Sequence, residues 1–404
     1  MAYKFRMPGG PTTATTGQAT RWAVTNGATT NNRGKFYYLS NDTIVAATTT
    51  ESQNNWLGGY NIFGVQGRVE ANIRALGYGK DASGNGIYIA ARVSTTNNEF
   101  AIQSADSVEV VAGDPPSHAD VNAWSLVDVT GSSGDLVKIF DIVWGADSGG
   151  ATAGTWMAVG DTGTNQEVYR SRDGGQNWQA VAIPSANSSK DVFTITSDGS
   201  GTWAFVHDDG FYLSTDDGAS FTRSTPFTMV RGFGVGYNQS NNTWIVSYFN
   251  GGTTHVRTCS GTDFTTWSSE TQISGTAGTF NDVNHSSAYI RAYNGRVMIQ
   301  PRVSDSIGNQ SKIAILDVNG TSISNLETIF ISGHSSNIRC SATDGETWLI
   351  GAQGGSIWKS SDNAESWVKI SEIRGPTSPD YAGPHTFGGG VVKISMAADV
   401  FLPL

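Results

Sequence analysis

The sequence predicts an all-β fold, and three observations lead to this prediction. Charged residues make up only 15% of the 404-residue chain, compared with about 25% in an ordinary soluble domain. Glycine (49 residues) and tryptophan (12 residues) are abundant, and short apolar runs separated by Gly, Asn and Asp recur along the chain. Because these residues favour strands and turns, the composition argues against a helical bundle and against a doubly wound α/β enzyme.

The charge and hydropathy patterns exclude two classes of partner. The formal net charge of −10 leaves no surplus of basic side chains to neutralise phosphates, so we expect no nucleic-acid partner. No segment approaches the roughly 18 consecutive apolar residues of a membrane span, so we expect no membrane insertion. The N-terminus lacks the apolar core of a secretion signal, which favours a virion protein made in the host cytoplasm, or otherwise a cytoplasmic protein.

A strand motif that recurs about every 50 residues decides the predicted fold. In its clearest copy, residues 154–160, turn residues precede an apolar run, and a further strand-like run lies before and after it. A unit of about four short strands at this period is typical of a propeller blade. The register positions of the motif are Ile44, Ile87, Trp156, Trp203, Trp244, Val297 and Trp348.

These repeats predict a single β-propeller with four-stranded antiparallel blades. The seven register positions favour seven blades, while the weak first copy and the chain ends leave six or eight open. The predicted organisation is an N-terminal arm (1–34), a β-propeller (35–375) with an insertion loop around 111–153, and a closing strand followed by an apolar tail (376–404).

A second motif follows the third strand of the repeating unit. Full copies occupy residues 171–178, 214–221 and 360–367, and a degenerate copy occupies residues 260–267. In such a hairpin, Asp accepts hydrogen bonds from turn amides, Gly supplies a backbone conformation closed to other residues, and the aromatic residue folds back onto the sheets. The predicted structural residues are Ser171, Asp173, Gly175, Trp178, Ser214, Asp216, Gly218, Phe221, Ser360, Asp362 and Trp367.

This second motif resembles the Asp-box of the BNR-repeat, sialidase-like β-propellers, a family that also occurs among bacteriophage virion proteins. The resemblance extends over residues 35–370 and is strongest from residue 154 onward. It implies a propeller with Asp-box hairpins on its outer rim, where the motif shapes the fold at a distance from any catalytic centre.

One segment points to enzymatic activity. Residues 5–8 (Phe-Arg-Met-Pro) resemble the Phe-Arg-Ile-Pro signature of sialidases, which implies Arg6 as a candidate for binding a substrate carboxylate. Arg291 and Arg302 are further candidates, but no spacing supports them. The Tyr nucleophile, its Glu partner and the Asp acid/base of that family have no match in motif. The sequence therefore shows no catalytic residues, cofactor-binding residues or metal ligands, and an enzyme is the less favoured reading.

Two smaller features complete the sequence predictions. Cys259 and Cys340 belong to no metal-binding pair and are expected to be buried thiols, with a disulfide between them left open. Residues 81–86 open like a calcium-binding loop, but Arg92 occupies the twelfth position, where such a loop needs a bidentate Glu. We therefore expect a hairpin turn there.

The sequence as a whole favours a non-catalytic β-propeller that acts as a virion structural and interaction protein on a tail, a fibre or the capsid surface. The expected partners are other virion proteins or a second copy, bound through the propeller faces and termini, together with host surface glycans. No cofactor is expected. The alternatives are a sialidase-like glycoside hydrolase and an intracellular assembly scaffold.

Overall fold

The structure is a computed structural model of the whole chain. It describes residues 21–26, 36–39, 56–60, 73–92, 99–104, 125–128, 138–150, 152–161, 166–184, 192, 194–207, 210–261, 264–273, 287–302, 312–330, 338–343, 347–352, 356–372 and 391–397. Arg6 and Ile44 lie outside these described residues.

The described strands form seven four-stranded antiparallel sheets, which we name A to G. Sheet A contains β28 (Val391–Ala397), β1 (Arg21–Asn26), β2 (Phe36–Leu39) and β3 (Trp56–Tyr60), in that order. Sheet B contains β4 (Ile73–Lys80), β5 (Gly86–Arg92), β6 (Glu99–Ser104) and β7 (Ser125–Asp128). Sheet C contains β8 (Lys138–Gly145), β9 (Thr155–Asp161), β10 (Gln166–Ser171) and β11 (Gln179–Val181).

The remaining sheets follow the same order along the chain. Sheet D contains β12 (Thr196–Ser197), β13 (Trp203–His207), β14 (Gly210–Ser214) and β15 (Thr222–Ser224). Sheet E contains β16 (Arg231–Asn238), β17 (Thr243–Asn250), β18 (Thr253–Ser260) and β19 (Thr271–Gln272), with the short helix η2 (Gln239–Asn241) between its first two strands. Sheet F contains β20 (Ser287–Tyr293), β21 (Arg296–Arg302), β22 (Lys312–Asn319) and β23 (Ser322–Phe330). Sheet G contains β24 (Ile338–Thr343), β25 (Trp348–Ala352), β26 (Ser356–Ser360) and β27 (Val368–Glu372).

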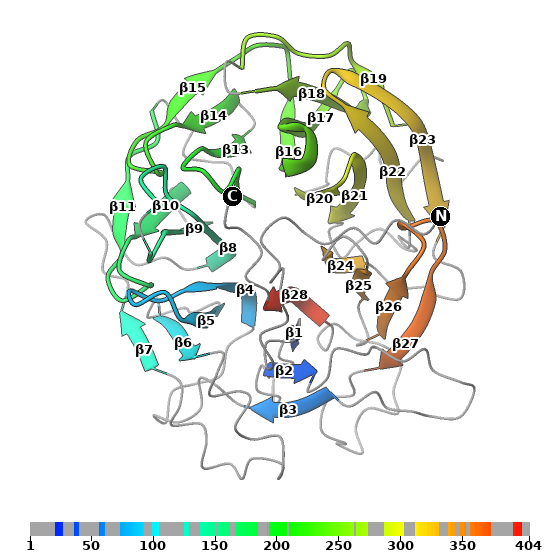
Figure 1. Cartoon of the computed structure of the whole chain (residues 1–404). Helices are drawn as coiled ribbons and strands as arrows, with labels where there is room; N and C mark the ends of the chain where they lie inside the picture. The colour runs from blue at the N-terminus through cyan, green and yellow to red at the C-terminus, as the bar shows by residue number, and fades with distance from the viewer. Residues whose placement is uncertain are drawn as a thin grey trace.

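The sheets are arranged around a common centre as the blades of a β-propeller (Figure 1). The first strand of each sheet lies near the centre and the last lies at the rim (Figure 1). Sheet A joins the two ends of the chain, because β28 pairs antiparallel with β1 from Arg21↔Ala397 to Asn26↔Val391. The protein is thus an all-β, single β-propeller with four-stranded antiparallel blades, as the repeats predict.

Strands of the propeller lie within two of the predicted segments. β1 falls within residues 1–34, which we expected to be an arm, yet it pairs with both β2 and β28. β7 and β8 fall within the expected insertion 111–153, yet they are the last strand of sheet B and the first strand of sheet C. In both places, the strands lie among Gly-, Ser-, Thr- and Pro-rich residues, whose turn propensity hides them.

The tryptophans that recur in the sequence form the core between the sheets. Trp156, Trp203, Trp244 and Trp348 each lie on the second strand of a sheet and are fully buried. Five hydrophobic clusters fill the seams between successive sheets from B to G. We name each seam by its two sheets, such as the C/D seam. A strand that packs against a sheet on both sides needs apolar side chains on both faces, which explains the apolar runs at the register positions.

Glycines on inner strands make room for these tryptophan rings. A Cβ at Gly77 on β4 would come within 2.9 Å of the Trp156 ring, and a Cβ at Gly145 on β8 within 2.9 Å of the Trp203 ring. Such separations are shorter than carbon–carbon contacts allow. The glycine of one sheet and the tryptophan of the next therefore set how closely the inner strands approach.

Candidate functional site

The three full copies of the second motif form turns of the same geometry, which we name the Ser-Asp turns (171–178, 214–221 and 360–367). In the first, Ser171 Oγ donates to Asp173 Oδ1 at 2.8 Å and accepts from the Gly175 amide at 2.9 Å. Asp173 Oδ1 also accepts from the amide of Asn177 at 2.9 Å, and its Oδ2 from the Asn177 side chain at 2.6 Å. Each polar atom of this Ser–Asp pair thus holds the turn's own backbone or side chains.

The other two turns repeat these bonds. In the second, Ser214 Oγ donates to Asp216 Oδ1 at 2.6 Å, and Asp216 accepts from the Ser220 amide at 3.0 Å. In the third, Ser360 Oγ donates to Asp362 Oδ1 at 2.6 Å. Asp362 accepts from both the amide and the hydroxyl of Ser366.

The hydrogen bonds lower the pKa of all three turn carboxyl groups. Burial acts to raise the pKa of Asp173, but hydrogen bonds from Asn177, Ser171 and Gln176 outweigh it and leave the pKa below its ordinary value. Burial likewise opposes the bonds from serine side chains and turn amides at Asp216 and Asp362, and again the pKa is lowered. These carboxylates are therefore ionised acceptors, and proton exchange with a substrate near neutral pH is not a role that suits them.

The fifth position of each turn requires a left-handed backbone. Gly175 has φ +82° and Gly218 has φ +76°. Ala364 takes this position in the third turn at φ +66°, and Phe264 takes it in the degenerate copy at φ +50°. The carbonyl at this position accepts the indole N–H three residues later in three copies, as the pairs Trp178–Gly175, Trp267–Phe264 and Trp367–Ala364 show.

The turns also contact the neighbouring sheet. In the C/D seam, the amide of Ser148, in the hairpin between β8 and β9, donates to Asp217 Oδ1 at 2.7 Å, and its hydroxyl donates to Oδ2 at 3.0 Å. Asp217 belongs to the Ser-Asp turn 214–221 of sheet D. In the B/C seam, a Cβ at Gly174 would come within 2.5 Å of the backbone nitrogen of Ala82. The first hairpin of one sheet thus meets the third turn of the next.

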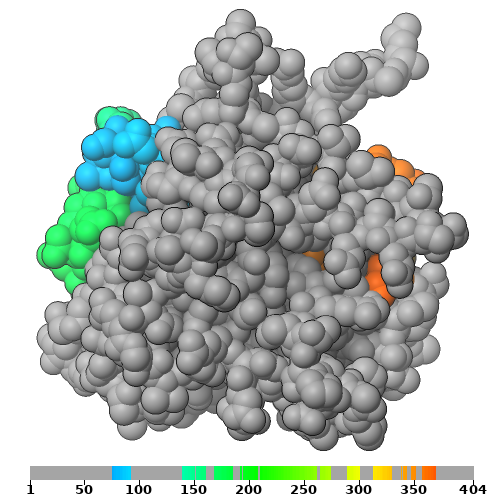
Figure 2. Space-filling model, turned by 90° about the horizontal axis from the view of Figure 1, so that it is seen from below, coloured from blue at the N-terminus to red at the C-terminus, as the bar shows by residue number. Residues whose placement is uncertain are grey.

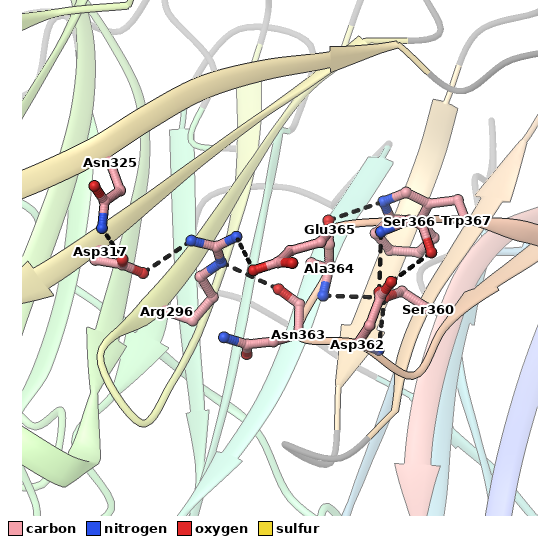
Figure 3. A network of polar contacts seen from close by, with 10 residues as sticks. All are labelled: Arg296, Asp317, Asn325, Ser360, Asp362, Asn363, Ala364, Glu365, Ser366 and Trp367. Carbon is pink, nitrogen blue, oxygen red and sulfur yellow. Dashed lines mark hydrogen bonds and ion pairs between the residues drawn. The ribbon is translucent and has the colours of Figure 1, made fainter.

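The F/G seam has the most charged version of this contact (Figure 3). Arg296, the first residue of β21, is 8% exposed. Its Nε donates to the carbonyl of Asn363 at 3.1 Å, and its Nη2 lies 3.6 Å from Glu365 Oε1. Both partners belong to the turn 360–367 of sheet G. On its own sheet, Arg296 Nη1 donates to Asp317 Oδ1 at 3.0 Å, and Asn325 donates to the other oxygen of that carboxylate at 2.7 Å.

Aromatic rings join sheets D and E. Phe264, in the degenerate turn 260–267, lies 5.5 Å from Phe211 of sheet D and 5.6 Å from Trp244, measured between ring centroids. Trp267 lies edge-on to Phe211 at 5.4 Å and to Phe227 at 5.1 Å. These spacings are those of favourable aromatic pairs.

A Tyr–Glu–Arg–His cluster in sheet E is a feature that the sequence reading missed. Tyr248 on β17 donates its hydroxyl to Glu270 Oε2 at 2.6 Å and accepts from Arg257 Nε at 2.8 Å. His255 Nδ1 lies 3.1 Å from Glu270 Oε1. The alternation of His255 and Arg257 along β18 was a usable signal, but no spacing pattern connects Glu270 to Tyr248.

This cluster does not have the properties of a tyrosine nucleophile. Tyr248 is fully buried, and burial followed by its hydrogen bond to Glu270 raises the pKa of its hydroxyl well above the ordinary value. An attacking phenol needs a lowered pKa or a nearby base with access to substrate. Arg257 also stacks over Phe227, 5.1 Å from the ring centroid. The cluster therefore joins β17 and β18 to the segment before β19.

The other predicted candidates are placed as follows. Arg291 on β20 donates to the carbonyl of Ser341 across the F/G seam at 3.0 Å, Arg302 ends β21, and Arg6 lies outside the described residues. Cys259 and Cys340 are buried thiols. Residues 81–85 form the predicted hairpin turn, in which Asp81 accepts from the amides of Ser83 and Asn85, each at 2.8 Å.

The described residues contain no group of three or more His, Cys, Asp or Glu side chains placed to hold a metal ion. They also contain no helix with the length and hydropathy to cross a bilayer.

Comparison with known proteins shows the fold. No protein-family model matches the chain, and no curated protein sequence matches it. An ancestral GH74 enzyme has a similar structure, with a TM-score of 0.52 and 13% identity, over 91% of this chain and 48% of that chain. YCF48 from Cyanidioschyzon merolae has a TM-score of 0.47 and 11% identity, over 81% of this chain and 94% of that chain. A structure of YCF48 bound to D1 peptide has a TM-score of 0.43 and 14% identity, over 74% and 81% of the two chains.

The chain spans about half the length of the GH74 enzyme. At such low sequence identity, a structural likeness carries information on architecture and none on activity. The conclusion from the comparisons is therefore that this chain has the β-propeller fold.

Proposed function

We propose that the protein is a non-catalytic structural and interaction protein of a virion, located on a tail, a fibre or the capsid surface. It presents the faces of a rigid β-propeller, together with its termini, to neighbouring subunits. The composition, rich in Thr, Asn and Gly and poor in charge, supports this proposal, as does the resemblance of its turn motif to BNR-type propellers that occur in phage virions.

The observation that carries the proposal is that charged side chains form hydrogen bonds within the turns and between adjacent sheets. The carboxylates of Asp173, Asp216 and Asp362 are bonded within their own turns. Asp217 and Arg296 connect adjacent sheets. Because these charged side chains bond to the protein itself, they stabilise a rigid scaffold. A rigid scaffold suits a protein whose function is to bind other subunits.

A count of seven blades is part of the proposal. Its support is the set of seven four-stranded sheets, together with the position of β28 next to both β4 and β24 (Figure 1). Pairing the two chain ends in one blade closes a propeller without leaving a free inner edge.

Host surface glycans are proposed as a second class of ligand. Sugar rings stack on exposed aromatic side chains, and sugar hydroxyls exchange hydrogen bonds with Asn amides and donate hydrogen bonds to Asp carboxylates. Titration of the purified protein with a panel of soluble glycans, with tryptophan fluorescence as the readout, tests glycan binding. This test does not depend on whether the protein is located in a virion.

The experiment that tests the location is density-gradient fractionation of the source culture, with detection of this protein in every fraction. The proposal predicts co-banding with intact particles at a fixed ratio to the major particle protein. Detection in the soluble fractions alone would contradict it. Tagged Gly174→Ala protein is the matched control, because a clash with the backbone of Ala82 disturbs the fold, so this variant is expected to be excluded from particles.

The hydrolase alternative has its own test. The purified protein is incubated with sialosides and other glycosides, with Arg6→Ala as the control. Turnover that disappears in Arg6→Ala would replace the proposed function by the hydrolase reading. The proposal predicts equal background rates for both proteins.

A further inference from the structure

A group of buried polar side chains lies in the F/G seam, on the inner half of the two sheets. Gln300 on β21 has no exposed surface, and within the described part of the chain neither its Oε1 nor its Nε2 has a hydrogen-bond partner. Ser341 on β24 is also fully buried, and its Oγ is without a partner there. Leaving such groups unpaired costs several times the value of an ordinary net hydrogen bond.

Strand register places these two side chains in the same seam. Gln300 is two residues from Met298 on β21, and Met298 belongs to the F/G hydrophobic cluster. Ser341 is directly opposite Ile350, which belongs to the same cluster. Because side chains alternate between the two faces of a strand, Gln300 and Ser341 both face the F/G seam.

Arg291 connects the two positions. Its guanidinium carbon lies 5.6 Å from the centre of the Tyr289 ring, and Tyr289 is directly opposite Gln300 on the neighbouring strand. Its Nε donates to the carbonyl of Ser341 at 3.0 Å. The arginine therefore extends from the strand beside Gln300 to the backbone of Ser341.

We propose that the F/G seam contains a buried water-binding site formed by the Gln300 amide and the Ser341 hydroxyl, beside the Arg291 guanidinium. The amide offers a carbonyl acceptor and an N–H donor, and the hydroxyl can both donate and accept. Buried waters are held by two to four such groups. The water pairs polar atoms that the described residues leave unpaired, and it fixes sheet G to sheet F on the inner side of the seam.

The site differs from the contacts of Arg296 in the same seam. Arg296 begins β21, next to the hairpin that contacts the turn 360–367, whereas Gln300 lies four residues further along the strand. The seam is thus joined by direct charged bonds near the hairpin and by a bridging water further along.

A crystal structure at a resolution that shows ordered water tests the site directly. The proposal predicts a water within hydrogen-bond distance of both the Gln300 amide and Ser341 Oγ. A dry seam, or a direct bond between the two side chains, would overturn it.

Thermal unfolding provides a second test, because the sign of the Tm change caused by Gln300→Met depends on whether the Gln300 amide binds a water or is unpaired. With the water present, Gln300→Met and Ser341→Ala each lower Tm by about 2 °C, and the double variant loses less than the sum. In a dry seam, Gln300→Met raises Tm, since it replaces an unpaired buried amide by an apolar side chain of similar size. Ile299→Val is the matched control: Ile299 belongs to the E/F cluster, so its effect adds to that of Ser341→Ala. Additive losses for Gln300→Met with Ser341→Ala would contradict a shared water.

Discussion

In both the F/G and the D/E seam, the third turn of one sheet contacts the preceding sheet, but the contact is charged in the F/G seam and aromatic in the D/E seam. In the F/G seam, the third turn of sheet G receives the Arg296 side chain, which bonds the Asn363 carbonyl and approaches Glu365. In the D/E seam, the equivalent turn of sheet E carries Phe264, whose ring contacts Phe211 of sheet D. Seen from below, residues of sheet B (blue) lie at the left of the view and residues of sheet G (orange) at the right (Figure 2).

One position in the turn accounts for the difference. Its fifth residue is Ala364 in sheet G and Phe264 in sheet E, and both have a left-handed backbone. A small residue at this position leaves space in the seam for polar side chains from the neighbouring hairpin. A large ring occupies the same space and replaces polar bonds by apolar burial. In the degenerate copy of the motif, an aromatic contact therefore takes the place of the polar contact between the sheets.

The largest expected effect is loss of the aromatic contact in the D/E seam. Trp267→Ala removes two ring pairs and the indole bond to the Phe264 carbonyl, and we expect a loss of about 3 kcal/mol in the free energy of unfolding. Denaturant unfolding measures it. A loss below about 1 kcal/mol would show that the aromatic rings do not join the two sheets.

Loss of the charged contact in the F/G seam is expected to be smaller. Arg296→Met keeps the apolar stem but removes three polar contacts, and we expect a loss of about 1.5 kcal/mol. The value is moderate because Asp317 and Glu365 are 37% and 68% exposed at their side chains, so water replaces the guanidinium. Arg296→Lys is the control: it retains the charge but lacks the planar fork, and an intermediate stability is expected.

Acid should weaken the Ser-Asp turns. The lowered pKa values of Asp173, Asp216 and Asp362 mean that their contribution to stability is complete above the unfolded pKa near 4. It is lost as the pH falls through the lower, folded values. Ser214→Ala removes one hydrogen bond to Asp216 and is expected to cost about 1 kcal/mol at pH 7. It also makes the loss of stability with acid shallower, which unfolding at a series of pH values below 5 measures. An unchanged acid dependence would show that this bond does not lower the Asp216 pKa.

The smallest effect is a gain. Ala364 has φ +66°, a conformation that glycine adopts more readily than alanine. Ala364→Gly is expected to stabilise the protein by about 0.5 kcal/mol, because relief of backbone strain is partly offset by the entropy of the unfolded chain. Gly218→Ala is the converse variant, at the same turn position. A loss of stability in Ala364→Gly would mean that the buried methyl group outweighs the strain.

The sequence was sufficient for the fold because the signals of the fold are local. The buried Trp156 and Trp203 begin or nearly begin apolar second strands, and the Ser171–Asp173 turn can be recognised within eight residues. β1 and β7 were missed because they lie among turn-forming residues, and β7 has only four residues.

The contacts between sheets could not be predicted in the same way. Arg296 and Asn363 are 67 residues apart, and Tyr248 and Glu270 are 22 residues apart. Neither pair follows from strand or turn periodicity. The first pair depends on how sheets F and G pack together, and the second on how the segment before β19 lies against β17 within sheet E. Side chains that pair across the fold leave no repeated spacing in a single sequence.

The salt dependence of Arg296→Met and Trp267→Ala tests the central comparison most directly. Unfolding free energies of wild type and both variants are measured at about 0.1 M and 1 M NaCl, where the Debye length falls from about 10 to 3 Å. The account predicts that the effect of Arg296→Met shrinks at high salt while the effect of Trp267→Ala persists. Equal salt dependence for the two variants would contradict the distinction between a charged F/G seam and an aromatic D/E seam.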